Sequence, residues 1–151
     1  MIKIKKPQGT ILIVIIFLLS CKSSTTQSTT YHTPMKDSTT LEGTWQLKAI
    51  PGNSIAFEKL YPKKNPVIVF DLEKKLASGY TGCNSFSGKL DKEGFAIRFM
   101  EPISITNRFC TGEGESIFIQ RLKEVTSYSI TNDSLLTLFK GEIAILEMTK
   151  K

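Results

Sequence analysis

Three cysteines carry the most reactive side chains in this chain of 151 residues: Cys21, Cys83 and Cys110. A thiol can take a lipid, form a disulfide, bind a soft metal ion or act as a nucleophile. A nucleophile usually needs an adjacent base, and the only histidine, His32, lies in a polar stretch that precedes Cys83 and Cys110. The sequence therefore offers thiol chemistry without the partner that nucleophilic catalysis requires.

Other catalytic patterns are weak. Glu93 with Glu101, or Glu113 with Glu115, could be imagined as the carboxylate pair of a glycoside hydrolase. Acids on loops and at helix starts, however, are far more often solvated. The chain has no Gly-Lys-Ser/Thr loop for phosphates and no dinucleotide glycine pattern after a strand. We expect no enzymatic activity and no cofactor.

Cys21 ends an apolar run, residues 11–19, that follows three lysines within the first six residues. A secretory signal needs this order: a positive start, an apolar helix of about 7 to 15 residues and a small residue at the cut. The run is too short for a membrane span, which takes about 20 residues. Residues 18–21, Leu-Leu-Ser-Cys, resemble a lipobox, where lipid joins the thiol and the chain is cut before it. We expect residues 1–20 to be a lipoprotein signal peptide and Cys21 to be lipidated. The alternative is an ordinary signal with an accidental cysteine.

Residues 22–40 contain eleven serine or threonine residues among nineteen, and almost no side chain suited to a core. Such a composition cannot offset the entropy cost of ordering the chain. We expect residues 21–40 to be a flexible tether between the lipidated cysteine and a folded domain.

The signal carries three of the six net positive charges, which leaves about +3 on the rest of the chain. The remaining lysines come in scattered pairs, such as Lys63-Lys64, and form no basic stripe, so a nucleic-acid partner is not indicated. The sequence instead predicts a protein held by lipid at the bacterial envelope. The absence of aspartate just after Cys21 resembles the Gram-negative sorting pattern for the outer membrane, and the lack of an acidic run favours its periplasmic face.

Residues 41–149 are numerous enough for one domain with a single core. Alternating apolar and polar residues predict half-buried strands at residues 44–50 and 95–99, the latter with Phe95, Ile97 and Phe99 on one face. Further strands are predicted at residues 67–70, 76–81, 85–90, 103–106, 134–139 and 143–148, the last two joined by a tight turn at residues 140–142.

One segment has helical spacing instead. Residues 113–125 place Phe118, Leu122 and Val125 on one helix face, with Glu113 and Glu115 at the end where a helix favours acids. This stripe could bind a partner, but a core-facing role is the more common one. The predicted fold is mainly β with one helix, an α+β domain: an antiparallel sheet or half-barrel packed on a single helix.

Two cysteines remain once Cys21 is assigned to lipid. In an oxidising compartment an even number suggests a disulfide, and Cys83 with Cys110 is then the only pair within the chain. Two buried free thiols and a metal site are the alternatives. A metal site is disfavoured because the predicted domain has no histidine, and two thiols do not complete the four ligands of structural zinc.

The segment around Cys83 is rich in residues with special backbone behaviour. Gly82 and Gly88 fit positions that need positive φ or a close chain approach, and Asn84 tolerates the left-handed region and can cap a turn. We expect a structural role for the segment. The alternative is that Asn84, Ser85 and Ser87 present a polar patch to a ligand or partner.

Four ordered segments resemble the META domain family, which includes a heat-shock lipoprotein of enteric bacteria. They are residues 41–45, residues 79–88, residues 106–110 and the helix with Glu115, Phe118 and Leu122. The residues of the family motif are Gly82, Cys83, Asn84, Phe86, Ser87, Gly88, Thr106, Arg108 and Cys110. The chain departs from the family at Ser85 and Asn107, where basic residues are common, and Arg108 lies one place later.

The resemblance implies a compact β-sheet domain with a packed helix, similar in shape to pilot lipoproteins that escort secretin subunits. It implies no established catalytic activity. We therefore expect a non-catalytic, stress-related or assembly binding module that meets another envelope protein. The alternative is a periplasmic inhibitor or a small-ligand-binding lipoprotein.

Overall fold

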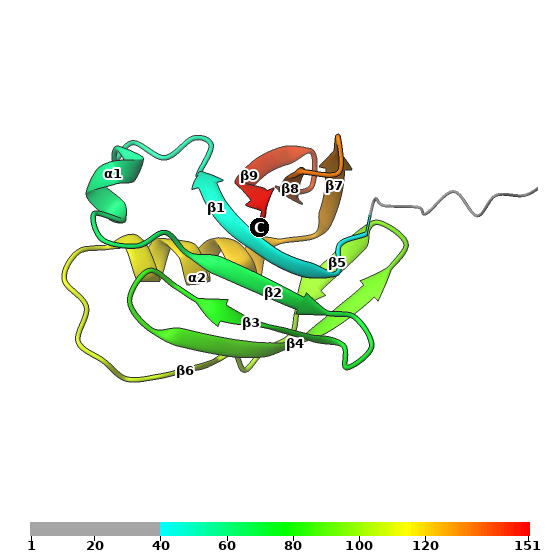
Figure 1. The fold of residues 1–151 in the computed structure, drawn as a ribbon, viewed down its shortest axis with the longest axis horizontal. Coiled ribbons are helices and arrows are strands. Elements are labelled where there is room, and N and C mark those ends of the chain that lie inside the picture. The colour runs from blue at the N-terminus through cyan, green and yellow to red at the C-terminus, as the bar shows by residue number, and fades with distance from the viewer. Residues whose placement is uncertain (1–39) are drawn as a thin grey trace, which may run out of the picture. The chain divides into compact units, whose positions relative to one another are not determined.

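The computed structural model describes residues 40–151, which fold into nine strands and two helices (Figure 1). The expected signal peptide, Cys21 and all but the last residue of the expected tether lie outside the described residues. The strands are β1 (Gly43–Ala49), β2 (Val67–Asp71), β3 (Leu76–Tyr80), β4 (Ser85–Glu93), β5 (Ala96–Phe99), β6 (Ser104–Ile105), β7 (Ser127–Thr131), β8 (Leu135–Lys140) and β9 (Ile143–Lys150). The helices are α1 (Phe57–Leu60) and α2 (Gly114–Glu124). Neither helix is long and apolar enough to cross a membrane.

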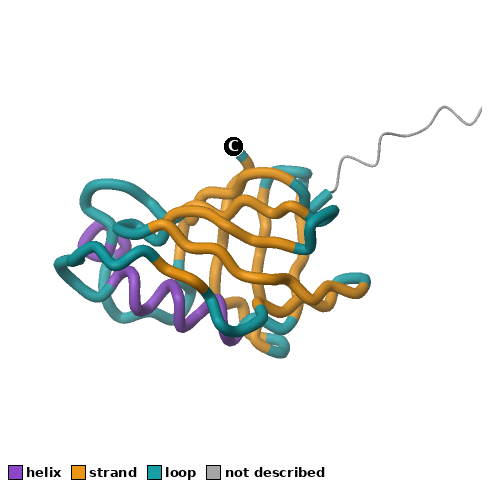
Figure 2. The backbone as a smooth tube through the Cα atoms, turned by 90° about the horizontal axis from the view of Figure 1, so that it is seen from below, coloured by secondary structure: helices purple, strands orange, loops and turns teal. Residues whose placement is uncertain are grey.

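The strands form one antiparallel sheet that closes on itself. Its order is β3-β2-β1-β9-β8-β7-β5-β4-β6, and β3 also pairs with β4, so eight strands make a ring to which β6 is added. The weakest junction joins β5 and β7, where Ala96 is opposite Ser127 and the backbone N–H of Tyr128 donates to the carbonyl of Phe95 at 3.0 Å. Figure 2 shows the strands crossing one another in this barrel-like sheet, with the longer helix alongside.

The core follows from the period-two pattern of the strands. Trp45 and Leu47 of β1 are buried, because residues two apart on a strand point to the same face. The indole N–H of Trp45 donates to the carbonyl of Leu41 at 2.8 Å, so its one polar group is satisfied inside the core. The other fully buried large side chains are Leu41, Ile68, Phe70, Ile97, Phe118, Leu122, Leu136, Leu138, Leu146 and Met148.

The expectation for α2 is confirmed. Phe118 and Leu122 have no exposed surface and Val125, just after the helix, is 2% exposed, so the stripe faces the core. The Phe118 ring meets the edge of Phe86 from β4, with ring centres 5.9 Å apart. Glu113 is the N-cap residue and Glu115 lies in the first turn, where the helix dipole favours acids.

The expected α+β class and antiparallel sheet are confirmed, with three differences. A second helix, α1, is present, and strand β7 was not predicted. Phe95 was expected on the inner face, but the turn between β4 and β5 includes it and leaves its side chain 72% exposed, against the ring of Tyr128. The inward alternation therefore starts at Ile97, which is 1% exposed.

Candidate functional site

Two loops that lie far apart in sequence meet at the start of α2. The first is residues 81–84, between β3 and β4, and the second is residues 106–113, between β6 and α2. A disulfide joins them through Cys83 and Cys110, whose Cα atoms are 5.9 Å apart. The predicted pairing is thus confirmed, and the alternative of two free thiols does not hold in this structure.

Asn84 connects the two loops by hydrogen bonds. Its side-chain carbonyl accepts from the Thr106 hydroxyl at 2.8 Å and from the Arg108 backbone N–H at 2.9 Å. Its amide nitrogen donates to the Arg108 carbonyl at 2.9 Å and to Oε1 of Glu115 at 3.1 Å. Both ends of the amide are therefore used, and the residue is 2% exposed.

Glu115 brings the first turn of α2 into the same network. Its Oε2 accepts from the Asn84 backbone N–H at 3.1 Å and from the hydroxyl of Thr81. Thr81 is fully buried, and its Oγ1 accepts from the Asn84 backbone N–H at 2.9 Å. Within the described residues no buried side-chain nitrogen or oxygen lacks a partner. We call this group of Thr81, Asn84, Thr106 and Glu115 the polar hub.

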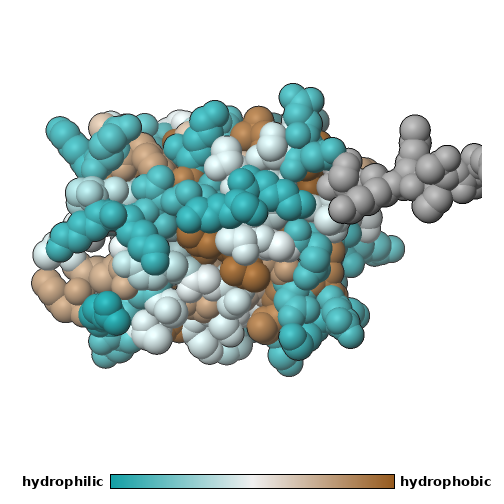
Figure 3. All heavy atoms as spheres, in the orientation of Figure 1, coloured by the Kyte–Doolittle hydropathy of each residue, from teal (hydrophilic) through white to brown (hydrophobic). Residues whose placement is uncertain are grey.

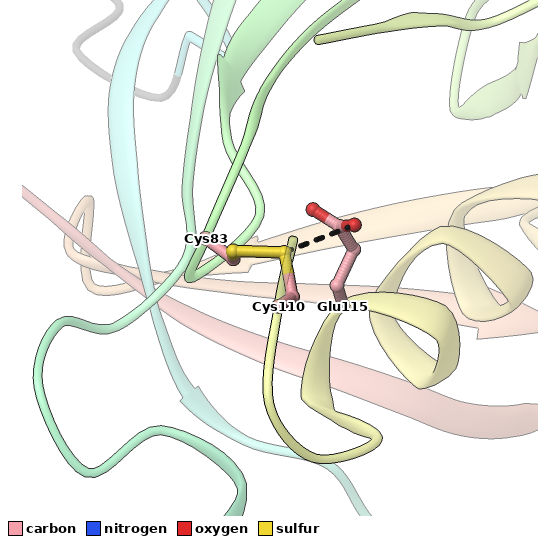
Figure 4. A group of neighbouring side chains, drawn as sticks. All are labelled: Cys83, Cys110 and Glu115. Carbon is pink, nitrogen blue, oxygen red and sulfur yellow. Dashed lines mark hydrogen bonds between the residues drawn. A yellow bond between two sulfur atoms is a disulfide. The ribbon is translucent and has the colours of Figure 1, made fainter. Parts of the chain in front are cut away.

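Figure 4 shows the disulfide beside the carboxylate of Glu115, which comes from the start of α2. Oε1 of Glu115 lies 3.4 Å from Sγ of Cys110. Cys83, Cys110 and Glu115 place potential metal ligands within 4.8 Å of one another. The two sulfurs are bonded to each other, however, and a thiolate is the form that binds metal. The expectation of no metal here stays a prediction.

A pocket of about 320 Å³ opens beside the disulfide. Tyr61 and Tyr80 give it aromatic walls, and Gly82 and Gly114 let the chain pass close to Tyr61. A Cβ on either glycine would come within 2.8 Å of the Tyr61 ring. The small residues are therefore needed for this ring to stand between the two loops, and Gly82 has the expected positive φ of 103°.

Charged and apolar side chains surround the pocket. Lys63 and Arg108 are among its lining residues, and the ammonium of Lys64 lies 4.6 Å above the ring centre of Tyr80. Phe109, next to the disulfide, has 89% of its surface exposed. Figure 3 shows mostly hydrophilic residues on the face in view, with a hydrophobic group at the side where Figure 1 places the loop between β6 and α2. The pocket thus combines unpaired positive charge with apolar surface.

Tyr61 anchors α1 to α2, and its replacement by phenylalanine is expected to cost about 1 to 2 kcal/mol of unfolding free energy. Its hydroxyl donates to the Gly114 carbonyl at 2.7 Å in a buried setting. Tyr128→Phe is the matched control, because the Tyr128 hydroxyl makes only a 3.5 Å bond at the surface, and its change should stay within about 0.5 kcal/mol. Urea denaturation of both variants measures the difference, and equal losses would contradict the role of Tyr61.

The same tyrosine gives a pH dependence. Burial raises the pKa of Tyr61 well above its ordinary value, so the folded chain holds the phenolic proton where the unfolded chain releases it. Its contribution is complete below about pH 10 and falls as the pH rises beyond that value. Tyr61→Phe should therefore lose less stability between pH 9 and about pH 11 than the unchanged chain does.

The motif residues Phe86, Ser87 and Gly88 all lie in strand β4. Phe86 packs in the core, Ser87 pairs across to Ser78 and Ser104, and Gly88 lies against Ile103, where a Cβ would come within 3.3 Å. Gly88 thus allows the chain to lie close to Ile103, and its φ is not positive. Asn84 was expected to cap a turn or, alternatively, to form a polar patch with Ser85 and Ser87. Its amide instead bridges two loops from a buried position, so it presents no surface to a ligand.

Sequence reasoning missed Tyr61, Thr81 and the pocket beside them. Tyr61 meets the second loop through a distant contact, the bond from its hydroxyl to Gly114. Thr81 lies beside Gly82 and bonds to Asn84 locally, but its contact with Glu115 spans 34 positions. The polar signature at residues 106–110 was the one available signal for the second loop. Of the acids considered for catalysis, Glu101 forms an ion pair with Lys123 at 2.8 Å, and Glu115 belongs to the polar hub.

Comparison with known proteins gives a family model and a fold. The model of the META domain matches residues 38–151. The chain is similar in fold to a protein from Burkholderia xenovorans solved by NMR, with 18% identity and a TM-score of 0.57 over 73% of this chain and 82% of that one. It is also similar to a DUF4847 family protein from Bacteroides vulgatus, with 12% identity and a TM-score of 0.52 over 73% of this chain and 93% of that one. No curated protein matches the chain in sequence.

Proposed function

The chain belongs to the META domain family, and from that premise we propose that it is an envelope-anchored lipoprotein whose domain binds a partner without catalysing a reaction. Lipid on Cys21 holds it at the outer membrane on the periplasmic side, and residues 21–40 form the tether. The apolar run before Cys21 and the lipobox-like residues 18–21 support the anchor. The partner is another envelope protein, met during stress or assembly.

The observation that carries the binding role is the pocket beside the disulfide. Its second loop is held by the bond between Cys83 and Cys110 and by Asn84, so the surface is largely preformed. Binding sites are usually concave, partly apolar and furnished with a few polar groups, as this pocket is. A rigid surface loses little conformational entropy on binding, which favours a recognition role.

A second candidate function is an inhibitor or small-ligand binder in the periplasm. Phe109 favours it, because an 89% exposed ring on a disulfide-held loop could enter the active site of a hydrolase. The same observation fits docking to an assembly partner, so the identity of the captured molecule separates the two.

Photo-crosslinking in intact cells tests the proposal. A photoreactive amino acid in place of Phe109 should give an adduct with one envelope protein, identified by mass spectrometry. The same amino acid in place of Phe95 is the matched control, since Phe95 is also an exposed phenylalanine, at 72%, but lies outside the pocket. The adduct should fall strongly in a Cys21→Ser chain, which lacks the thiol that takes lipid.

Three other results would change the proposal. If positions 109 and 95 gave adducts with the same set of proteins, the crosslinks would reflect non-specific collisions and would overturn the binding role. A single hydrolase in the adduct would favour the inhibitor. Full retention of the Cys21→Ser chain in the membrane fraction would overturn the lipid anchor.

A further inference from the structure

We propose that the pocket beside the disulfide binds a peptide carboxylate that stands next to an aromatic or aliphatic side chain. This names the chemistry of the partner and rests on the proposed function. The peptide carboxylate would meet Lys63 and Arg108, and the apolar side chain would meet Phe109 and the tyrosine walls.

Charge is the first argument. Among residues 40–151, Lys63 and Arg108 form no ion pair, although both line one pocket. Elsewhere in this part of the chain Lys74, Arg121, Lys123 and Lys140 have acidic partners, whereas other basic residues, such as Lys92, form no ion pair either. What sets Lys63 and Arg108 apart is that both line one concave site. Two cations left unpaired at one concave site favour an anion, and an arginine can hold a carboxylate by two parallel hydrogen bonds.

Glu115, the one acid of residues 40–151 that lines the pocket, forms no ion pair with Lys63 or Arg108. Both carboxylate oxygens of Glu115 accept hydrogen bonds from Thr81 or Asn84, and the residue lies in the first turn of α2. The hub donors and the positive end of the helix already stabilise its charge. The pocket therefore keeps a positive balance toward an incoming anion.

Apolar surface is the second argument, and it selects a peptide over a bare anion. Phe109 and the walls formed by Tyr61 and Tyr80 would stay in contact with water around an inorganic phosphate or sulfate. A ligand with a side chain beside its carboxylate would cover that surface and gain about 25 cal/mol for each square ångström. A peptide end supplies both groups together, because a carboxylate and a side chain share its last residue.

Rigidity is the third argument. Arg108 belongs to the loop that the disulfide holds through Cys110, and its backbone N–H and carbonyl both bond to Asn84. The guanidinium is thus attached to a fixed main chain, while its side chain is exposed and makes no ion pair with any acid of residues 40–151. Fixing the main chain in advance lowers the entropy cost of recognition.

The test uses the full chain in a nonionic detergent and the probe acetyl-Gly-Phe with a free carboxylate, followed by NMR. The probe should shift the backbone amides of Gly82, Cys83 and Thr111, which line the pocket. The carboxamide form of the same probe should bind about tenfold more weakly, as should the free acid to Arg108→Gln or Lys63→Gln. Lys92→Gln is the charge control, because Lys92 is a basic residue outside the pocket, above the ring of Tyr128, and should leave affinity unchanged.

Salt and competitors sharpen the result. Affinity for the free acid should fall as salt rises from 0.05 M to about 0.5 M, because exposed charges are screened. Equal affinity for the acid and the carboxamide would overturn the proposal. Equal shifts with inorganic phosphate would show an anion site with no need for an apolar group, and tighter binding of phosphatidylglycerol vesicles would assign the site to lipid; either result would overturn it too.

The carboxylate-binding pocket and the envelope binding module can fail separately. A Phe109 adduct that persists unchanged in Arg108→Gln cells, together with no probe binding, would leave the binding module standing and remove the carboxylate chemistry. Probe binding without any adduct in cells would keep the pocket chemistry and remove the envelope partner.

Discussion

Asn84→Asp is expected to lower the free energy of unfolding by about 3 to 5 kcal/mol at pH 7, from the loss of buried hydrogen bonds and the burial of a poorly paired charge. The new oxygen would replace a nitrogen that lies 2.9 Å from the Arg108 carbonyl and 3.1 Å from Oε1 of Glu115. Two donated bonds would be replaced by repulsion between acceptors. The loops that form the pocket would then be held by the disulfide without the amide between them.

The loss should shrink as the pH falls. Burial and the neighbouring carboxylate of Glu115 favour the protonated form of the introduced acid in the folded chain, so its pKa should be higher there than in the unfolded chain. A raised folded-state pKa means that stability returns as the pH drops through it, and a protonated oxygen can donate to Glu115 again. Urea denaturation at pH 7 and near pH 4.5, each against the unchanged chain, measures this recovery.

Asn53→Asp is the matched control. The Asn53 amide also donates to a backbone carbonyl, that of Ile55 at 2.8 Å, but it is part-buried and this bond involves no carboxylate. It should lose about 1 kcal/mol and show little recovery at low pH. Similar losses at positions 53 and 84, or a loss at position 84 that does not change with pH, would contradict the account of the polar hub.

Removing the disulfide is expected to cost about 3.5 kcal/mol in the chain-entropy model. Cys83 and Cys110 are 27 positions apart, so the bond closes a loop that an unfolded chain without it would leave free. The variant Cys83→Ser with Cys110→Ser should unfold at lower urea concentration, and Cys83→Ser alone should lose about as much as the double variant. The unchanged chain treated with dithiothreitol should move toward the same midpoint.

Hydrogen exchange should show which backbone amides lose protection when the disulfide is removed. Amides of residues 106–113 should exchange faster in the double variant, because this loop has no strand or helix of its own. Amides in β8 and β9 should keep the same order of protection, since these strands pair along their length. Uniform acceleration across both regions would mean that the bond acts only on global stability, and unchanged stability would refute the prediction.

Much of the sheet could be predicted from the sequence, because strands that bury one face alternate in a way that is visible locally. Thr44 to Ile50 gives such a pattern, and the β-branched run Val67 to Phe70 indicates a strand by its composition; the structure has β1 and β2 there. Strand β7 was missed although Tyr128 and Ile130 alternate with polar residues and pack against the core, because the segment is only five residues long and both side chains are only partly buried. Helix α1 has four residues, too few for a helical period.

The site was predicted in part. The resemblance supplied the two loops, and the count of cysteines supplied their bond, which the structure contains. The partners of Asn84 could not be found from the sequence, because Thr106, Arg108 and Glu115 lie 22 to 31 positions away, and a lone asparagine reads locally as a turn residue. Tyr61 and Lys63 join the pocket only through the closure of the fold, so no local pattern marks them.

The closed ring of strands bears on how many copies could share one membrane. Open sheets have edges whose free N–H and C=O groups can pair with a neighbouring molecule and start aggregation. Within residues 40–151 each of the eight ring strands has a neighbour on both sides, and the added strand β6 is only two residues long. Free strand edge is therefore confined largely to β6 and to β7 beyond Ser127, the one residue of β7 that is opposite β5, so copies held side by side would have little edge through which to join sheet to sheet.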